Sequence, residues 1–151
     1  MAYGEVACLL KYFQNQALKN PSFYHVVHLD SAEQITDIFW ADARMIFDYG
    51  LFGDVVSFDT TYQTNEANSP FEVFVGINHH RETVIFGTAL MYDETADSST
   101  WLFETFFDAM SNKIPKSIFI DQGAAMAKAC ANVMPNTYHM LSIWYIMNIM
   151  P

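Results

Sequence analysis

Two aspartates stand in or directly after segments that otherwise read as buried strands. Asp59 lies within the segment 52–65, FGDVVSFDTTYQTN, and Asp121 follows the apolar run 117–120, SIFI. Charged side chains are seldom buried without a partner, so two core strands that each deliver a carboxylate suggest a shared site. Metal-dependent phosphoryl chemistry uses clustered carboxylates of this kind to hold divalent ions and to activate water.

Each acid also has a structural interpretation, and the local sequence leaves both interpretations open. Asp59 can be an acid at a strand end that bonds to Thr60, Thr61 or backbone. Asp121 precedes an Ala-rich segment, where an aspartate makes a good helix N-cap. Glu104 is a further acid, but its position in a predicted helix among aromatic residues favours a solvated side chain over a metal ligand.

Length and composition favour one globular domain. The chain has 151 residues, of which 52% are hydrophobic and 16% are charged. Its apolar runs are shorter than the roughly 20 residues of a membrane span, and its first residues lack a signal-peptide pattern. We therefore expect a cytosolic or nuclear protein without a membrane partner. Cys8 and Cys130 belong to no Cys-x-x-Cys pair and are expected to be free thiols.

The charge balance argues against nucleic-acid binding by this segment alone. The formal net charge is −10, and the seven basic residues are spread singly along the sequence. A phosphate backbone is normally gripped by a cluster of Lys and Arg, which the sequence does not contain. We expect DNA to be a partner only through segments outside these residues.

Hydrophobic spacing predicts an N-terminal extension, residues 1–50, in front of a core, residues 51–151. Apolar residues from Val6 to Leu18 recur at helical spacing, which predicts a helix that ends before Pro21. In the extension we expect a helix over 4–19, strands over 23–29 and 34–41 with a turn at 30–33, and a short helix over 42–49 closed by Gly50.

The core pattern predicts an α/β fold. We expect strands over 54–62, 71–78 and 83–92, a helix over 98–112 capped by Ser98 or Ser99, a strand over 117–120, a helix over 123–133, a strand over 136–141 and a helical tail over 142–150. The core order β-β-β-α-β-α-β is that of a ribonuclease H-like mixed sheet with helices on both faces. Ligands in such sheets sit at strand ends near a topological switch point, where Asp59 and Asp121 would converge.

Several long runs of residues carry a resemblance to a known family. They are FWADAR (39–44), FGDVVSFDTTY (52–62), the run 70–80, WLFET (101–105) and IDQ (120–122). In these runs the chain resembles plant far-red impaired response proteins, which derive from Mutator-like element (MULE) transposases. The resemblance covers nearly the whole chain and implies a ribonuclease H-like transposase core with an Asp-Asp-Glu metal site. Asp59 matches the first catalytic acid of the family and Asp121 the second.

The resemblance also implies what this stretch lacks. The third acid of the family, a glutamate, lies downstream of Pro151, so we expect a truncated core with an incomplete site. Asp59 and Asp121 are expected to bind Mg²⁺ or Mn²⁺ weakly, and catalysis by these residues alone is not expected. Zinc is expected only in the family's flanking domains, a DNA-recognition domain before this core and a SWIM-type finger after it.

The family implies a nuclear location, a role in the regulation of transcription, and association with copies of itself or related proteins. Two alternatives remain open, a residual metal-dependent transposase or nuclease and a non-functional gene remnant. Family members usually carry a cysteine and a histidine where Ser142 and Tyr145 stand, which puts a metal role for His139 in doubt. The other histidines, at 25, 28, 79 and 80, are not expected to share a metal ion, because each pair points to opposite faces or lies in a turn.

Overall fold

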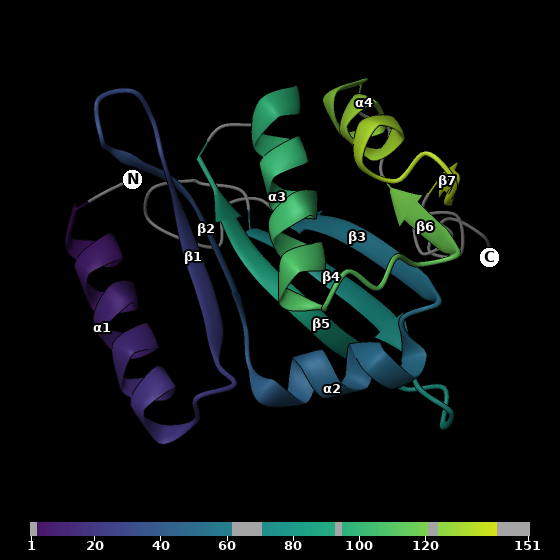
Figure 1. The fold of residues 1–151 in the computed structure, drawn as a ribbon, viewed down its shortest axis with the longest axis horizontal. Coiled ribbons are helices and arrows are strands. Elements are labelled where there is room, and N and C mark those ends of the chain that lie inside the picture. Colours follow the sequence, from purple (N-terminus) through teal and green to yellow (C-terminus); the bar gives the residue numbers. More distant parts are fainter. Residues whose placement is uncertain (1–2, 62–70, 93–94, 121–123, 142–151) are drawn as a thin grey trace.

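The computed structural model describes residues 3–61, 71–92, 95–120 and 124–141, and within them one mixed β-sheet carries helices packed against it (Figure 1). The elements in chain order are α1 (Tyr3–Lys19), β1 (Tyr24–Leu29), β2 (Ile35–Ala41), α2 (Ala43–Phe52), β3 (Val55–Thr61), β4 (Phe71–Ile77), β5 (Thr83–Met91), α3 (Ala96–Ala109), β6 (Ser117–Ile120), α4 (Ala124–Val133) and β7 (Tyr138–Leu141). The predicted α/β class and element order are confirmed over this part of the chain. The predicted helical tail over 142–150 lies outside the described residues.

The sheet has seven strands in the order β1-β2-β5-β4-β3-β6-β7. The first four neighbouring pairs in this order, β1–β2, β2–β5, β5–β4 and β4–β3, are antiparallel. Strand β6 pairs parallel with both β3 and β7. The first hairpin therefore extends a sheet whose centre is β3, the strand that carries Asp59. The parallel strands β6 and β7 are joined by a crossover through α4, whereas the chain between β3 and β6 passes through β4, β5 and α3.

Alternation of side chains along the strands defines two faces of the sheet. Phe58 pairs with Phe74 and Asp59 pairs with Val73, so the two residue pairs point to opposite sides. We call the side of Phe58 and Phe74 the α3 face, because the α3 residues Phe103 and Phe106 pack on it. We call the opposite side, which carries Asp59 and Val73, the Asp59 face.

Aromatic side chains form the core between the sheet and α3. Phe106 stacks on Phe74 with ring centroids 4.0 Å apart and an interplanar angle of 3°. Phe103 lies 5.3 Å from Phe58, and Tyr49 of α2 lies 5.0 Å from Phe106. Helix α4 lies beside α3 on the same side of the sheet (Figure 1) and adds Cys130 to this core. The repeated aromatic contacts fix α3 over the central strands.

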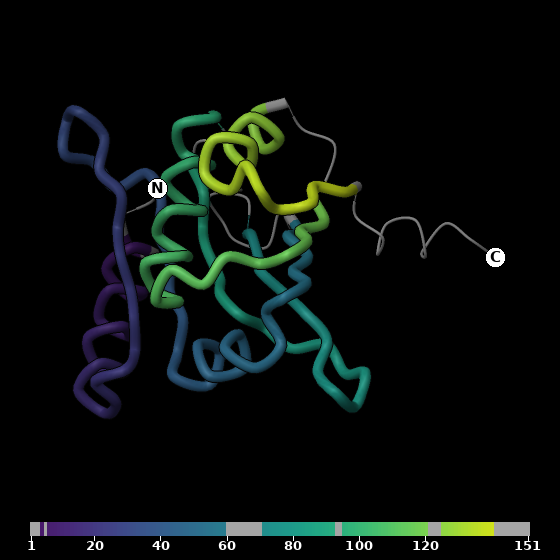
Figure 2. The backbone as a smooth tube through the Cα atoms, turned by 45° about the vertical axis from the view of Figure 1, so that its right-hand side comes forward, coloured from purple at the N-terminus to yellow at the C-terminus, as the bar shows by residue number. Residues whose placement is uncertain are grey.

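Helix α1 packs on the other side of the sheet, and only at its β1–β2 end within the described residues. Phe13 of α1 is fully buried and lies 5.2 Å from Trp40 and 5.7 Å from Phe23. Trp40 pairs with Thr88, which pairs with Val73, so Phe13 sits on the Asp59 face. Figure 2 shows α1 and the first hairpin at one end of the molecule and α4 and β7 at the other.

Two of the hairpins close with the same kind of turn. The Oδ1 atom of Asp30 accepts from the amides two and four residues later, and Oδ1 of Asn78 does the same. The residue three positions after each has a positive φ, 60° at Glu33 and 63° at Arg81. A short polar side chain at the first position thus holds a left-handed residue that is not glycine.

The predicted end of α2 at Gly50 was wrong. The helix continues to Phe52, and the amide of Gly53 closes it by donating to the carbonyl of Tyr49 at 2.8 Å. Gly50 is exposed within the helix, and a Cβ there would meet no atom within 4 Å. A Cβ at Gly53 would lie 2.5 Å from the Tyr49 carbonyl oxygen, so it is Gly53 that the chain needs.

The predicted bounds of α3 were also wrong at both ends. The N-cap is Thr95, whose side chain accepts from the Ser98 amide, while Ser98 and Ser99 are buried in the first turn. The helix ends at Ala109, because Ser111 and Asn112 have positive φ values of 55° and 64°. Serine is a favourable N-cap residue in general, but here Ser98 and Ser99 are buried within the first turn and Thr95 is the cap.

We predict opposite effects for alanine at the two glycines of this segment. Gly50→Ala is expected to raise the free energy of unfolding by about 0.5–1 kcal/mol, because alanine loses less conformational entropy in a helix. Gly53→Ala is expected to lower it by more than about 1 kcal/mol, because the new Cβ collides with backbone. Urea unfolding followed by circular dichroism measures both, and equal effects would contradict the structure of this helix end.

Candidate functional site

Asp59 lies on the central strand β3, half-buried on the Asp59 face. Its Oδ1 accepts a long hydrogen bond from the Ser57 hydroxyl, at 3.4 Å, from two residues earlier on the same strand and the same face. Its partner on β4 is Val73, and it is the one charged residue that the described strands β3 to β7 place on this face. A half-buried carboxylate is costly unless it is partnered, and Asp59 has the Ser57 hydroxyl as one partner, so its position is compatible with a hydrogen-bonding role as well as with a ligand role.

Asp121 lies outside the described residues. Strand β6 ends at Ile120, directly before it, and β6 pairs parallel with β3 through Ser57 and Phe119. Among the described residues, no three His, Cys, Asp or Glu side chains gather closely enough to hold a metal ion together. The predicted roles of Asp59 and Asp121 thus stay predictions.

Glu104 does not come near Asp59. It is exposed on α3, and α3 covers the face of the sheet opposite to the one that carries Asp59. Its position is that of a solvated helical acid, as the sequence predicted.

His25 and His28 point to opposite faces as their spacing predicts, whereas the rings of His79 and His80 lie close together, with centroids 3.9 Å apart. His25 stacks on Phe13 at 5.2 Å on the Asp59 face, whereas His28 stacks on Trp101 of α3 at 4.8 Å on the opposite face. His79 and His80 lie in the exposed turn after β4. Nε2 of His139 lies 3.0 Å from the carbonyl oxygen of Met134, a structural contact between β7 and the end of α4.

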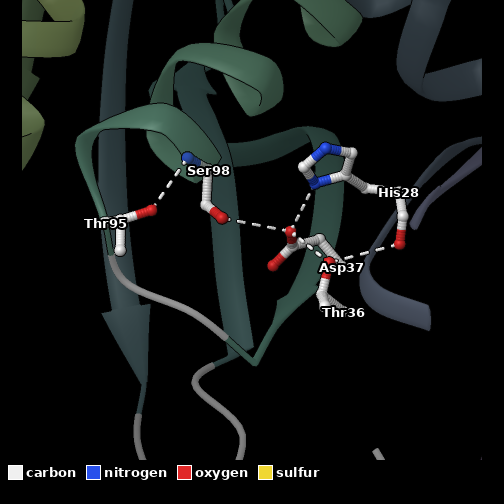
Figure 3. A network of polar contacts seen from close by, with 5 residues as sticks. All are labelled: His28, Thr36, Asp37, Thr95 and Ser98. Atoms are coloured by element: carbon white, nitrogen blue, oxygen red, sulfur yellow. Dashed lines mark hydrogen bonds and ion pairs between the residues drawn. The ribbon is translucent and has the colours of Figure 1, made fainter. Parts of the chain in front are cut away.

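The sequence analysis missed the most deeply buried polar cluster of the described chain, which centres on Asp37 (Figure 3). Asp37 is completely buried in β2, and its Oδ2 accepts from Nδ1 of His28 at 2.8 Å. The hydroxyls of Thr36 and Ser98 lie 3.0 and 3.2 Å from the same oxygen. The cluster joins β1, β2 and the first turn of α3, whose N-terminal dipole favours a negative charge at this point.

A signal for this cluster was present in the sequence. Asp37 interrupts the otherwise apolar strand ITDIFWA, the same observation that drew attention to Asp59. Its partner Ser98 is 61 residues away, and no local pattern indicates that the two meet. The sequence therefore showed an acid within an apolar strand, whereas the hydrogen-bond partners of that acid could not be predicted from it.

The Asp37 cluster contains serine, histidine and aspartate, but it is not arranged for nucleophilic catalysis. A catalytic triad needs the serine hydroxyl bonded to the imidazole, which takes its proton. Here the Ser98 hydroxyl and the His28 imidazole both bond to one carboxylate oxygen, so the aspartate stands between them. Within the described residues the other oxygen, Oδ1, has no hydrogen-bond partner. The arrangement can hold the first hairpin against α3.

The two thiols differ in reactivity. Cys8 is exposed on α1, whereas Cys130 is buried in the core under α4. Burial raises the pKa of the Cys130 thiol from 9.0 to about 12, so that it is not a nucleophile near neutral pH. Among the residues that the structure describes, neither thiol belongs to a group of possible metal ligands.

Comparison with known proteins places the chain among transposase-like sequences. The family described as MULE transposase domain matches residues 55–149. FAR1-RELATED SEQUENCE 7 of Arabidopsis thaliana is 42% identical over 138 residues, which are 91% of this chain and 18% of that protein. FAR-RED IMPAIRED RESPONSE 1 of the same plant is 36% identical over 148 residues, 98% of this chain and 18% of that protein. The resemblance inferred from the sequence runs is confirmed.

The chain spans about a fifth of the length of the curated relatives it matches. These relatives are Arabidopsis thaliana proteins named for the far-red impaired response or as related to FAR1. None of the described helices is long and apolar enough to cross a lipid bilayer.

We predict that Asp37→Ala destabilises the fold far more than alanine at Asp97, an exposed acid in the α3 turn that Asp37 contacts. The substitution leaves the buried Ser98 hydroxyl and the His28 imidazole without their acceptor, which is expected to lower the free energy of unfolding by about 3 kcal/mol. Asp97→Ala is the matched control, because Asp97 is exposed in the first turn of α3, and a loss below about 1 kcal/mol is expected. Similar losses in urea unfolding would show that the buried cluster contributes little.

We predict that one of the two thiols reacts with a disulfide reagent at pH 8, namely that of Cys8. Cys130 should react only on unfolding, and Cys8→Ser should abolish the fast reaction while Cys130→Ser should not.

The burial of the Cys130 thiol also predicts that the free energy of unfolding depends on pH. The thiol loses its proton near pH 9 when unfolded and near pH 12 when folded, so stability should fall by about 1.4 kcal/mol per pH unit as pH rises between these values.

Proposed function

Because the chain belongs to the MULE transposase domain family, we propose that it is a transposase-derived nuclear protein that acts in the regulation of transcription. The support is similarity, over more than nine tenths of the chain, to plant proteins of the far-red impaired response type. We propose that its core is a scaffold or association surface and does not cleave DNA by itself. The distribution of its acidic residues supports the proposal that the core does not cleave DNA by itself.

The strand order supports a ribonuclease H-like assignment of the sheet. Strands β5, β4 and β3 form an antiparallel run, and β6 and β7 continue from β3 in parallel. The three strands β3, β4 and β5 are consecutive in the chain, and helices precede β6 and β7. This order is the one that the family resemblance implies, with the first family acid, Asp59, on the central strand.

The register between β3 and β6 supports a shared site for the two family acids. Val55, Val56 and Ser57 pair with Ser117, Ile118 and Phe119. We propose that the same register extends by two residues along both parallel strands, which would bring positions 59 and 121 opposite each other. Paired positions in a sheet share a face and are close in space. Asp59 and Asp121 would then act on one ligand.

Two carboxylates fit the ligand chemistry of Mg²⁺ or Mn²⁺, with water molecules completing the coordination sphere. Such an ion, when bound, polarises a phosphoryl oxygen and lowers the pKa of bound water. A two-metal site needs further ligands, and Glu104 lies on the other face of the sheet. We therefore propose one weakly held ion and no cleavage of DNA by the described residues.

The surroundings of the basic residues support weak DNA binding by this segment. Nζ of Lys113 and Nζ of Lys116 lie 3.8 and 3.7 Å from the carboxylate of Asp54. Nε of Arg44 lies 3.2 Å from a carboxylate oxygen of Asp48. These cations are offset by neighbouring acids in a chain of net charge −10, so they offer little to a phosphate backbone. We propose that DNA contacts in such proteins are made by other parts of the molecule.

We predict that the purified protein does not nick supercoiled DNA in Mn²⁺ above the level of its Asp59→Asn variant. The physical reason is that the described residues place no third carboxylate beside Asp59, and a two-metal site needs further ligands to stabilise both the attacking and the leaving oxygen. Asp59→Asn is nearly isosteric and serves as the matched control, and Asp121→Asn is its counterpart. Nicking by the wild type that both variants abolish would overturn the proposal in favour of a residual nuclease.

The regulatory role is tested in the organism that encodes the chain. Loss of the gene is expected to change transcript levels, and the tagged protein is expected in the nucleus. The Asp59→Asn gene should restore those transcripts as well as the wild type does, because a scaffold does not need the acid. Failure of Asp59→Asn to restore them, with normal protein levels, would show that the metal site serves the function.

A further inference from the structure

Among the contacts that the structure describes, His28 is the histidine that is bonded to a carboxylate. Its Nδ1 lies 2.8 Å from Oδ2 of Asp37, whose side chain is completely buried. The hydroxyls of Thr36 and Ser98 lie near the same oxygen, and the first turn of α3 favours a negative charge there. A carboxylate is an acceptor only, so the proton between the two groups belongs to Nδ1 of His28.

A proton on Nδ1 leaves the second ring nitrogen, Nε2, with a free lone pair, because a neutral imidazole has one donor and one acceptor nitrogen. Figure 3 shows this second nitrogen of His28 on the side of the ring that points away from Asp37. Within the described residues no hydrogen bond involves Nε2. The buried carboxylate therefore selects the tautomer in which the nucleophilic nitrogen is directed away from the polar cluster.

The indole of Trp101 holds the imidazole in this orientation. The two ring centroids lie 4.8 Å apart with an interplanar angle of 14°, so the indole covers one face of the His28 ring. Trp101 is itself half-buried on α3 and packs against the core. The side chain of His28 is nevertheless 34% exposed. With Nδ1 directed at a buried oxygen and one face stacked, the exposed part consists of the other face and the edge that carries Nε2.

We propose that His28 is a nucleophilic imidazole that accepts acyl groups from neutral, activated acyl compounds, and that Asp37 is its positioning residue. The Nε2 lone pair forms a bond to the acyl carbon, and the bond from that carbon to the leaving group breaks with its electron pair. The ring then carries a positive charge, which the carboxylate beside Nδ1 stabilises. Transfer of the Nδ1 proton to the leaving group gives the neutral acyl-histidine.

The surroundings of His28 favour an uncharged acyl group over a phosphoryl group. The chain has a net charge of −10 and places a carboxylate beside the imidazole, and both features repel an anionic phosphoryl donor. An acyl group on Nε2 lies in the plane of the imidazole and so runs parallel to the indole of Trp101, which offers it an apolar neighbour. Ser98 has no part in the step, because the imidazole itself is the nucleophile. The inference concerns a modification site on the first hairpin and does not rest on the proposed function.

Acylation of the full chain with diethyl pyrocarbonate at pH 7.5 tests the reactivity, with peptide mass spectrometry following each histidine over time. We expect His28 to be modified severalfold faster than His25. His25 is the matched control, because it is also half-buried on β1, and its described ring neighbours are Phe13 and Phe23 and not a carboxylate. A rate at His28 equal to or below that at His25 would overturn the proposal.

Asp37→Asn tests the role of the carboxylate. Asparagine is nearly isosteric, but its amide nitrogen can donate to Nδ1 and so favours the tautomer with the proton on Nε2. We expect the rate at His28 to fall severalfold, while the rates at His79 and His80, which lie in an exposed turn, stay the same. An unchanged rate at His28 in the folded variant would show that Asp37 does not position the ring.

The tautomer in the wild-type protein decides the question even if Asp37→Asn fails to fold. The nitrogen-15 chemical shifts of labelled histidine distinguish a protonated from an unprotonated ring nitrogen. At pH 7.5 we expect His28 to carry its proton on Nδ1 and to have an unprotonated Nε2. A proton on Nε2 under these conditions would remove the nucleophile and overturn the proposal.

Discussion

The architecture depends on one constraint, the alternation of side chains along the central strand β3. Phe58 points to the α3 face, where Phe74 and Phe103 enclose it, and Asp59 points to the other side. A shift of one residue in register would bury the carboxylate under α3 and expose the aromatic ring. Because β3 has an antiparallel partner on one side and a parallel partner on the other, its register fixes both halves of the core sheet.

A second acid, Asp37, lies on the opposite face of the sheet from Asp59. Asp37 lies fully buried on the α3 face, and it is tolerated there because hydroxyl and imidazole donors converge on one of its oxygens. Such a cluster is more costly to break than it is stabilising to form, so it specifies one arrangement of its elements. It thereby attaches the first hairpin to α3. The N-terminal extension is thus held by polar contacts on one face and by Phe13 on the other.

The position of the acids bears on the proposal that this transposase-related core does not cleave DNA by itself. Asp59 lies on the opposite face of the sheet from α3, where the Ser57 hydroxyl is one of its polar partners. Asp59 is the one charged position that the described residues of β3 to β7 place on that side, an arrangement that suits the packing of apolar side chains better than the binding of two metal ions. The same features that weaken a metal site, few acids and many apolar side chains, strengthen an association surface.

The sequence by itself determined the kind and order of the elements and the family. Strand and helix periods are local properties, so ITDIFWA and FEVFVGI read correctly as strands, and the ends of most elements were placed within a few residues. It also determined that Asp59 and Phe58 point to opposite sides, since that follows from adjacency alone. The order of strands in space was not local and came from the family resemblance for the core.

Tertiary structure decided the partners. Ser98 is a buried donor to Asp37 and not a helix cap, because Asp37 approaches it from far away in the chain. Gly53 and not Gly50 ends α2, because a side chain at position 53 would not fit against Tyr49. Which face each helix covers was decided in the same way, by how much apolar surface each packing buries. Burial sums over many distant residues, and no local pattern contains that sum.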